Sequence, residues 1–140
     1  MTVLVAFDFG KKRIGVSVGD TLTRSARALP ALANDWTAVE RAVREWGPDA
    51  FVVGLPLGRD GDEQPITREA RAFAQRLHES FARPVHLVDE RYTSLAAASQ
   101  LREARNSGAM TRRVRKGDED SAAAQLILEQ WLREKAGTGG

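Results

Sequence analysis

Cysteine and long apolar segments are both missing from this chain of 140 residues. Without cysteine, disulfides, cysteine-ligated zinc and thiol catalysis are excluded. No segment approaches the roughly 20 apolar residues that a membrane helix needs. The apolar opening is interrupted by Asp8 and followed by Lys11, Lys12 and Arg13, which is not the charge order of a signal peptide. We therefore expect a cytoplasmic protein that does not contact a membrane.

The composition argues against both a disordered chain and a second large lobe. Hydrophobic residues make up 42% of the chain and charged residues 29%, which is typical of a globular domain with a packed core. A length of 140 residues lies within the usual size of one domain. We expect one domain over residues 1–135, followed by a flexible C-terminal tail over residues 136–140.

The order of the expected elements indicates an α/β protein. Alternating apolar residues predict two hairpin strands at 3–7 and 14–18, and Pro30 suits an edge strand at 28–32. Asn34 or Asp35 can cap a helix at 36–46. The other expected elements are strands at 50–55 and 84–88, helices at 66–81, from Thr93 or Ser94 to 104, and at 119–134, and a loop at 106–117. This order predicts a mixed central sheet, with an antiparallel hairpin meander and parallel strands, flanked by helices.

Three acidic residues stand at the ends of expected buried segments. Asp8 lies near the end of the first strand, Glu90 follows the strand at 84–88, and Asp120 lies in the first turn of the last helix. Carboxylates that meet at one sheet edge repel one another unless a cation lies between them, and hard oxygen ligands favour Mg²⁺ or Mn²⁺. Each acid also has a structural interpretation: Asp8 as a turn former, Glu90 as a partner of Arg91, and Asp120 as a charge that favours the helix dipole. The residues alone leave both interpretations open.

Basic residues gather ahead of Asp120. Between Arg102 and Lys116, the Lys and Arg residues are opposed only by Glu103. Such a cluster is typical of phosphate contacts. An ordinary solvated charge run explains the same pattern equally well.

Four sequence blocks, taken together in this order and spacing, form a distinctive pattern. They are residues 8–20 (DFGKKRIGVSVGD), 53–61 (VGLPLGRDG) with Glu63, Gln64 and Pro65 after them, 89–93 (DERYT) and 120–128 (DSAAAQLIL). In order and spacing these blocks resemble the YqgF family, also called RuvX, whose members are RuvC-like proteins of the ribonuclease H-like superfamily. The resemblance spans about residues 3–132, nearly the whole chain.

The resemblance implies a ribonuclease H-like fold and a divalent-metal-dependent nuclease, with catalytic and metal-binding roles for Asp8, Glu90 and Asp120 and with Mg²⁺ or Mn²⁺ as cofactor. It implies maturation of the 5′ end of pre-16S ribosomal RNA, with RNA favoured over DNA and ribosomal precursor particles as partners. Resolution of Holliday junctions is the alternative. Either a monomer or a homodimer is compatible with the sequence.

The resemblance also implies that residues of this chain contact nucleic acid, and it favours the phosphate-binding interpretation of the basic cluster. The loop residues Gly54, Pro56 and Gly58 are expected to shape the substrate cleft. The expected nucleic-acid-binding residues are Lys11, Lys12, Arg13, Arg91, Arg105, Arg112, Arg113, Arg115 and Lys116.

The chain departs from the family pattern at two places. Asp118 and Glu119 add acids just before Asp120, so Asp118 could replace or assist Asp120 in the metal site. We favour Asp120, because the apolar residues that follow it set the register. Tyr92 stands where relatives commonly have an aliphatic residue, which leaves Glu90 intact.

Two other function classes compete with a nuclease. An actin-like or sugar-kinase-like ATPase also begins with an Asp-x-Gly hairpin, but it needs two related lobes and a second phosphate loop. A non-catalytic ribosome-assembly factor that binds nucleic acid would keep the fold and lose the acids, yet Asp8, Glu90 and Asp120 are all present.

Overall fold

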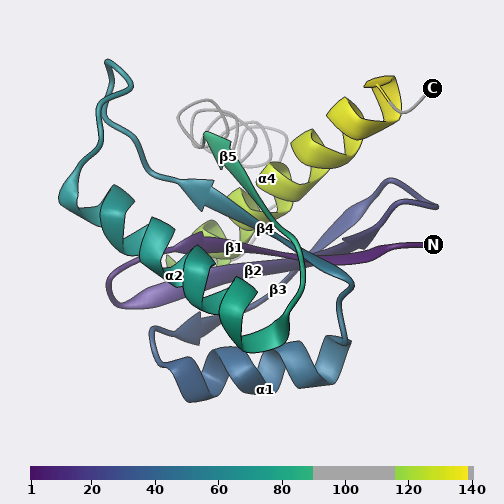
Figure 1. Ribbon diagram of the computed structural model, residues 1–140, viewed down its shortest axis with the longest axis horizontal. Coiled ribbons are helices and arrows are strands. Elements are labelled where there is room, and N and C mark those ends of the chain that lie inside the picture. Colours follow the sequence, from purple (N-terminus) through teal and green to yellow (C-terminus); the bar gives the residue numbers. More distant parts are fainter. Residues whose placement is uncertain (90–115, 139–140) are drawn as a thin grey trace, which may run out of the picture.

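The computed structural model describes residues 1–89 and 116–138, and within these ranges it describes the side chains of residues 1–89 and 121–134. The described residues form a five-stranded sheet with the order β3-β2-β1-β4-β5 and helices on both faces (Figure 1). The elements are β1 (Val3–Phe9), β2 (Arg13–Asp20), β3 (Ala26–Ala33), α1 (Trp36–Trp46), β4 (Ala50–Leu55), α2 (Pro65–Phe81), β5 (Val85–Asp89) and α4 (Lys116–Thr138).

The sheet is mixed, as the element order predicts. β1 pairs with β2 and β2 with β3 in antiparallel fashion, while β1 pairs with β4 and β4 with β5 in parallel. Pro30 lies in β3, at one edge of the sheet, where a missing backbone donor costs no ladder hydrogen bond. The fold class expected from the sequence is confirmed.

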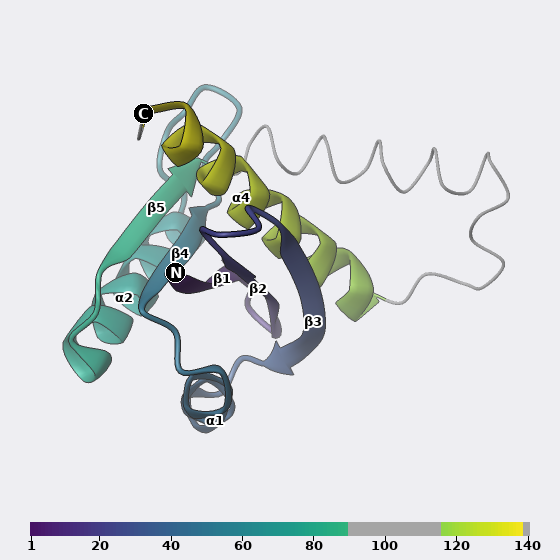
Figure 2. The same cartoon turned by 90° about the vertical axis from the view of Figure 1, so that its right-hand side faces the viewer.

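Two apolar layers hold the helices against the sheet. Odd-numbered residues of β1, such as Val5 and Phe7, pack with α1 and α2 on one face. Leu4 and Ala6 point to the opposite face and pack with α4. Figure 2 shows α1 and α2 on one side of the strands and α4 on the other. β4 is buried along its whole length, as its uninterrupted apolar run predicts.

Local signals set the ends of α1. Asp35, rather than the alternative Asn34, caps the helix, because its side chain accepts a hydrogen bond from the backbone N–H of Thr37 at 3.1 Å. Gly47 ends the helix in the left-handed conformation, with φ of 52°, which glycine adopts without a steric cost. The helix has the bounds that the sequence predicts.

The last helix is longer at both ends than the sequence predicts. It begins at Lys116 and not near residue 119, so Lys116 and Gly117 are helical and do not belong to the expected loop. It ends at Thr138, so the first three residues of the expected tail are also helical. Gly117 costs about 1 kcal/mol in a helix, which is small enough for the flanking helix formers to offset. The expected helix from Thr93 or Ser94 to 104 lies outside the described residues.

None of the helices in the part of the chain that the structure describes is long and apolar enough to cross a membrane.

Candidate active site

Asp8 lies at the carboxyl end of β1, on the face of the sheet that α4 covers. It is the second-last residue of the strand and is half-buried. In the strand register it lies beside Gly15 of β2 and Gly54 of β4. Because paired residues point to the same face of a sheet, no side chain stands directly beside Asp8 on either neighbouring strand.

The carboxyl end of β5 lies at the same edge of the sheet. Gly54 pairs with Val88, and Leu55 pairs with Asp89, the last residue of β5. Val88 belongs to the apolar layer under α4, so Asp8, Gly54 and Val88 form one row across the same face. Glu90 follows Asp89 in the chain and lies outside the described residues.

Two serines attach the start of α4 to β2. Ser121 is buried, and its Oγ accepts a hydrogen bond from the backbone N–H of Val16 at 3.4 Å. Ser17 donates its hydroxyl hydrogen to the carbonyl oxygen of Ala124 at 2.7 Å. Val16 is next to Gly15, the partner of Asp8 in the register. The helix backbone at Asp120, one residue before Ser121, is therefore near the end of β1 that carries Asp8.

The structure brings Asp8, the end of β5 and the start of α4 close together. Of the three predicted acids, it describes the side chain of Asp8 alone. The side chains of Asp118 and Asp120 and all of Glu90 lie outside what is described. Within the described residues no group of three or more Asp, Glu or His side chains has the arrangement of a metal site. The metal-binding roles of these residues therefore stay predictions.

The loop after β4 has a defined shape at this edge. Thr67, fully buried in α2, donates a hydrogen bond to the carbonyl oxygen of Pro56 at 2.5 Å and accepts one from the N–H of Gln64 at 3.0 Å. A Cβ atom on Gly58 would lie 2.5 Å from Oδ1 of Asp62 and 2.8 Å from Nε2 of Gln64. The loop conformation therefore requires glycine at position 58 or a shift of these side chains.

Thr67 is a residue that the sequence reasoning missed. Its signal is its place at the third position of α2, where its side chain and that of Gln64 form a capping box. It fixes the loop that carries Pro56 and Gly58 to the helix. The role of that loop in a substrate cleft stays a prediction.

The turn between β1 and β2 presents basic side chains next to Asp8. Lys11 and Lys12 are exposed, and Arg13 is half-buried. Asn34 holds this turn through two hydrogen bonds. Its Nδ2 donates to the carbonyl oxygen of Gly10 at 2.6 Å, and its backbone N–H donates to the carbonyl oxygen of Lys12 at 3.1 Å. Asn34 therefore braces the turn, a role that its expected function as a helix cap did not include.

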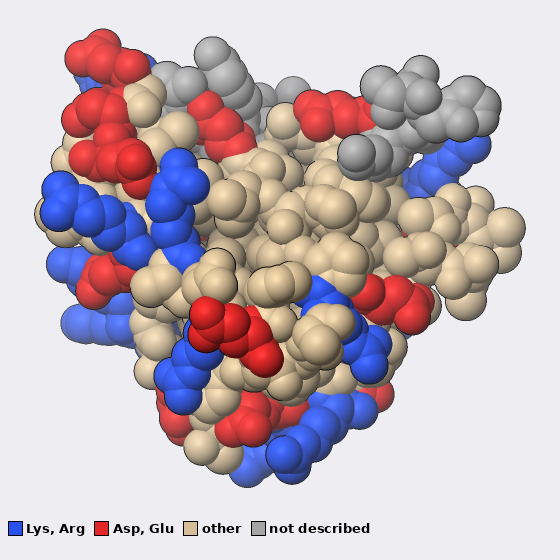
Figure 3. All heavy atoms as spheres, in the orientation of Figure 1, with Lys and Arg blue, Asp and Glu red and all other residues tan. Residues whose placement is uncertain are grey.

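Charge of both signs gathers on the side of the molecule that holds this turn. Figure 3 shows acidic side chains over the loop after β4, and Lys and Arg side chains below them, toward the β1–β2 turn and the start of α2. The acidic residues of that loop are Asp60, Asp62 and Glu63, of which Glu63 pairs with Arg71 at 2.7 Å. The expected basic residues Arg91, Arg105, Arg112, Arg113 and Arg115 lie outside the described residues, as does the side chain of Lys116.

A family model and individual relatives of known sequence place this chain in the same family. The RuvX family, described as Holliday junction resolvase, matches residues 2–134. A Yersinia enterocolitica protein, provisionally named pre-16S rRNA nuclease, is 47% identical over 139 residues, which is 96% of this chain and 96% of that protein. A Salmonella arizonae protein of the same provisional name is 46% identical over 136 residues, which is 94% of this chain and 96% of that protein.

The fold is also that of a solved resolvase. T. thermophilus RuvC, in complex with a Holliday junction substrate, matches with a TM-score of 0.58 and 16% identity, covering 99% of this chain and 98% of that one. At that identity the likeness concerns the fold alone. The match over residues 2–134 and the identity to the Yersinia protein show that this chain belongs to the RuvX family.

Proposed function

We propose that this protein is a divalent-metal-dependent nuclease that hydrolyses phosphodiester bonds in the maturation of the 5′ end of pre-16S ribosomal RNA. Family membership and the provisional names of the Yersinia and Salmonella relatives support a nuclease that acts on this RNA. The observation that carries the proposal is the placement of Asp8. It lies between two glycine positions, at the sheet edge that leads into Glu90, beside the start of the helix that carries Asp120.

The donor chemistry of this edge fits a hard divalent cation. Asp8, Glu90 and Asp120 offer carboxylate oxygens, which Mg²⁺ and Mn²⁺ prefer. We assign the metal to these three residues, with Asp118 as a further candidate ligand. When bound, the metal would supply Lewis-acid stabilisation of the phosphodiester and lower the pKa of a water ligand.

The residues of the chain have separate tasks in this proposal. Asp8 lies on the central strand of the sheet, which fixes the backbone position from which its carboxylate extends. Lys11 and Lys12, on the turn that Asn34 braces, contact phosphates of the substrate. Such contacts give affinity and orientation rather than choice of sequence. The basic cluster from Arg105 to Lys116, together with Arg13 and Arg91, extends them.

A Holliday-junction resolvase is the second candidate, and the description of the family favours it. The two candidates differ in the symmetry that they require. A four-way junction needs two equivalent active sites and therefore a homodimer, whereas trimming of an RNA end needs one active site. A binding factor without catalysis is the third outcome that an experiment has to separate.

The test compares cleavage of three matched substrates in Mg²⁺ and in Mn²⁺. They are a single-stranded RNA with a ribosomal precursor 5′ extension, a single-stranded DNA and a four-way junction. Asp8→Asn removes one carboxylate charge. We expect it to lower cleavage of RNA by more than the about 10–100-fold that loss of an outer-shell partner costs at a metal site.

Asp49→Asn is the matched control. Asp49 lies at the opposite end of the sheet, where its Oδ2 accepts a hydrogen bond from the N–H of Val3 at 2.9 Å, a bond that an asparagine oxygen can also accept. This variant should cut at the wild-type rate. A second readout is thermal: Mn²⁺ should raise the melting temperature of the wild-type protein more than that of Asp8→Asn, because a ligand that binds the folded state stabilises it.

Each outcome has a distinct meaning. Cleavage of the RNA that is lost in Asp8→Asn supports the proposal, and paired symmetric nicks in the junction support the resolvase. An Asp8→Asn protein that cuts at the wild-type rate removes Asp8 from the site. No cutting of any substrate by the wild-type protein favours the binding factor.

A further inference from the structure

The start of α4 meets β2 at a point where the pairing of β2 with β3 is irregular. The register of this pairing shifts between Ile14 and Val16. Gly15 therefore faces two residues of β3, at positions 30 and 31, where a regular ladder has one. On its other side Gly15 pairs with Asp8 of β1. A shift of this kind disrupts the ladder locally and is common beside active sites.

Ser121 contacts the sheet at this irregularity. Its Oγ accepts a hydrogen bond from the backbone N–H of Val16 at 3.4 Å, although the residue is only 3% exposed. A buried hydroxyl is costly unless it is hydrogen-bonded. Alanine, which occupies the next three positions, avoids this cost and has a higher helix propensity. Serine at position 121 therefore indicates a role for the bond to β2.

Ser121 is the anchor of α4 nearest to Asp120. It is the first residue of the helix whose side chain the structure describes, and Asp120 lies one residue before it. The later turns have other attachments to the sheet. Ile127 and Leu128 are fully buried in the apolar layer, and the carbonyl oxygen of Ala124 accepts the hydroxyl hydrogen of Ser17 at 2.7 Å.

We propose that Ser121 is a positioning residue of the metal site. Its bond to Val16 sets the place of the first turn of α4, and with it the backbone from which Asp120 extends, relative to Asp8. The inference rests on the proposed function, because it takes Asp8 and Asp120 as ligands of the same cation. Mg²⁺ requires near-ideal octahedral geometry, so a displacement of one carboxylate weakens binding even though every ligand remains in the chain.

The test measures binding of Mn²⁺ to the protein by titration calorimetry, without nucleic acid. Ser121→Ala removes the hydroxyl and places a good helix former in the helix. We expect this variant to bind Mn²⁺ about tenfold more weakly than the wild type, since loss of an outer-shell partner has effects of this size at metal sites. Its melting temperature without metal should change by less than about 2 °C, because the gain in helix propensity offsets the loss of a long hydrogen bond.

Ser17→Ala is the matched control, because it removes the other serine hydrogen bond between β2 and α4. That bond lies a helical turn past Asp120, on a part of the helix that apolar packing also holds. Ser17→Ala should therefore melt at a lower temperature and still bind Mn²⁺ as the wild type does. A residue that only stabilised the fold would lower the melting temperature without changing the affinity, so the two variants separate stability from positioning.

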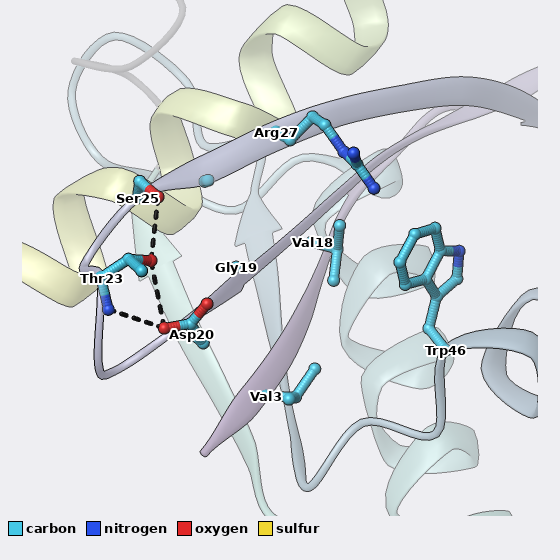
Figure 4. A pocket seen from close by; sticks show the side chains of 9 residues that line it. Val3, Val18, Gly19, Asp20, Thr23, Ser25, Arg27 and Trp46 are labelled. Carbon is cyan, nitrogen blue, oxygen red and sulfur yellow. Dashed lines mark hydrogen bonds between the residues drawn. The ribbon is translucent and has the colours of Figure 1, made fainter. Parts of the chain in front are cut away.

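Binding of Mn²⁺ at another carboxylate needs its own control. Asp20 also lies on β2, in a pocket of about 480 Å³ that Trp46 and Arg27 help to line (Figure 4). It pairs with Val3, which is five positions before Asp8 on β1 and about 17 Å away along the strand. Asp20→Asn should leave the affinity for Mn²⁺ unchanged. A loss of binding in this variant would place the measured cation in the pocket and overturn the inference.

The outcomes separate this inference from the proposed function. If the wild type binds no Mn²⁺, or if Asp8→Asn or Asp120→Asn binds as tightly as the wild type, the proposed metal site fails and the inference fails with it. If both acid variants lose binding while Ser121→Ala keeps the wild-type affinity, the metal site stands and the positioning role is wrong. The role is also wrong if Ser17→Ala weakens binding as much as Ser121→Ala does.

Discussion

Replacing Ser17 by alanine tests one of the two serine hydrogen bonds between α4 and the sheet. Ser17 is fully buried, and its hydroxyl donates to the carbonyl oxygen of Ala124 at 2.7 Å. Loss of one buried neutral hydrogen bond costs about 1 kcal/mol. The Ala124 carbonyl lies inside a helix and keeps its helical hydrogen bond, so the cost of an orphaned acceptor does not arise. We expect the free energy of unfolding to fall by about 1 kcal/mol, and the melting temperature by about 4 °C.

Chemical denaturation followed by circular dichroism measures this change. Ser80→Ala, on the exposed surface of α2, is the matched control and should change stability by less than about 0.5 kcal/mol. The denaturant dependence of the free energy should stay the same in both variants, because the surface exposed on unfolding does not change. If Ser17→Ala and Ser80→Ala are equally stable, the bond between Ser17 and Ala124 contributes nothing and the argument for it is wrong.

Two further predictions concern single residues away from α4. Gly47→Ala should lower the free energy of unfolding by about 1 kcal/mol, because φ at position 47 is 52° and no atom within 4 Å of an added Cβ compensates; an unchanged denaturation midpoint would contradict this. The hydrogen bond from the Thr23 backbone lowers the pKa of Asp20 from 3.8 in the folded state, so the ionised group stabilises the fold above pH 3.8 and loses this effect as the pH falls through the lowered pKa. Wild-type protein should therefore lose stability relative to Asp20→Asn on acidification, and parallel pH profiles would count against that bond.

Most of the fold could be predicted because its signals are local. The bounds of α1 follow from a capping residue, a helical apolar pattern and Gly47, all within a few residues of one another. The bounds of β4 follow from an uninterrupted apolar run. The predicted start of α4, near residue 119, was wrong because Gly117, a residue of low helix propensity, lies just after the true first residue, Lys116.

Less of the candidate site could be predicted. Asp8 stood out because an acid interrupts an apolar strand, and the structure places it at the sheet edge beside the start of α4. The two glycines beside it, Gly15 and Gly54, are adjacent to Asp8 only through strand pairing. Thr67 has a polar role that the apolar pattern of α2 does not reveal. The roles of Glu90 and Asp120 stay predictions.

By itself, the sequence determined the element types, the mixed sheet and the family, because hydrophobic periodicity, caps and motif spacing depend on residues close together in the chain. The tertiary structure alone decided which residues meet across long separations. Val16 and Ser121 are 105 positions apart, and Arg27 reaches Trp46 from a different element. Such contacts arise when elements pack and are encoded in no local pattern, which is why the attachment of α4 beside Asp8 and the pocket around Asp20 became visible only in the folded chain.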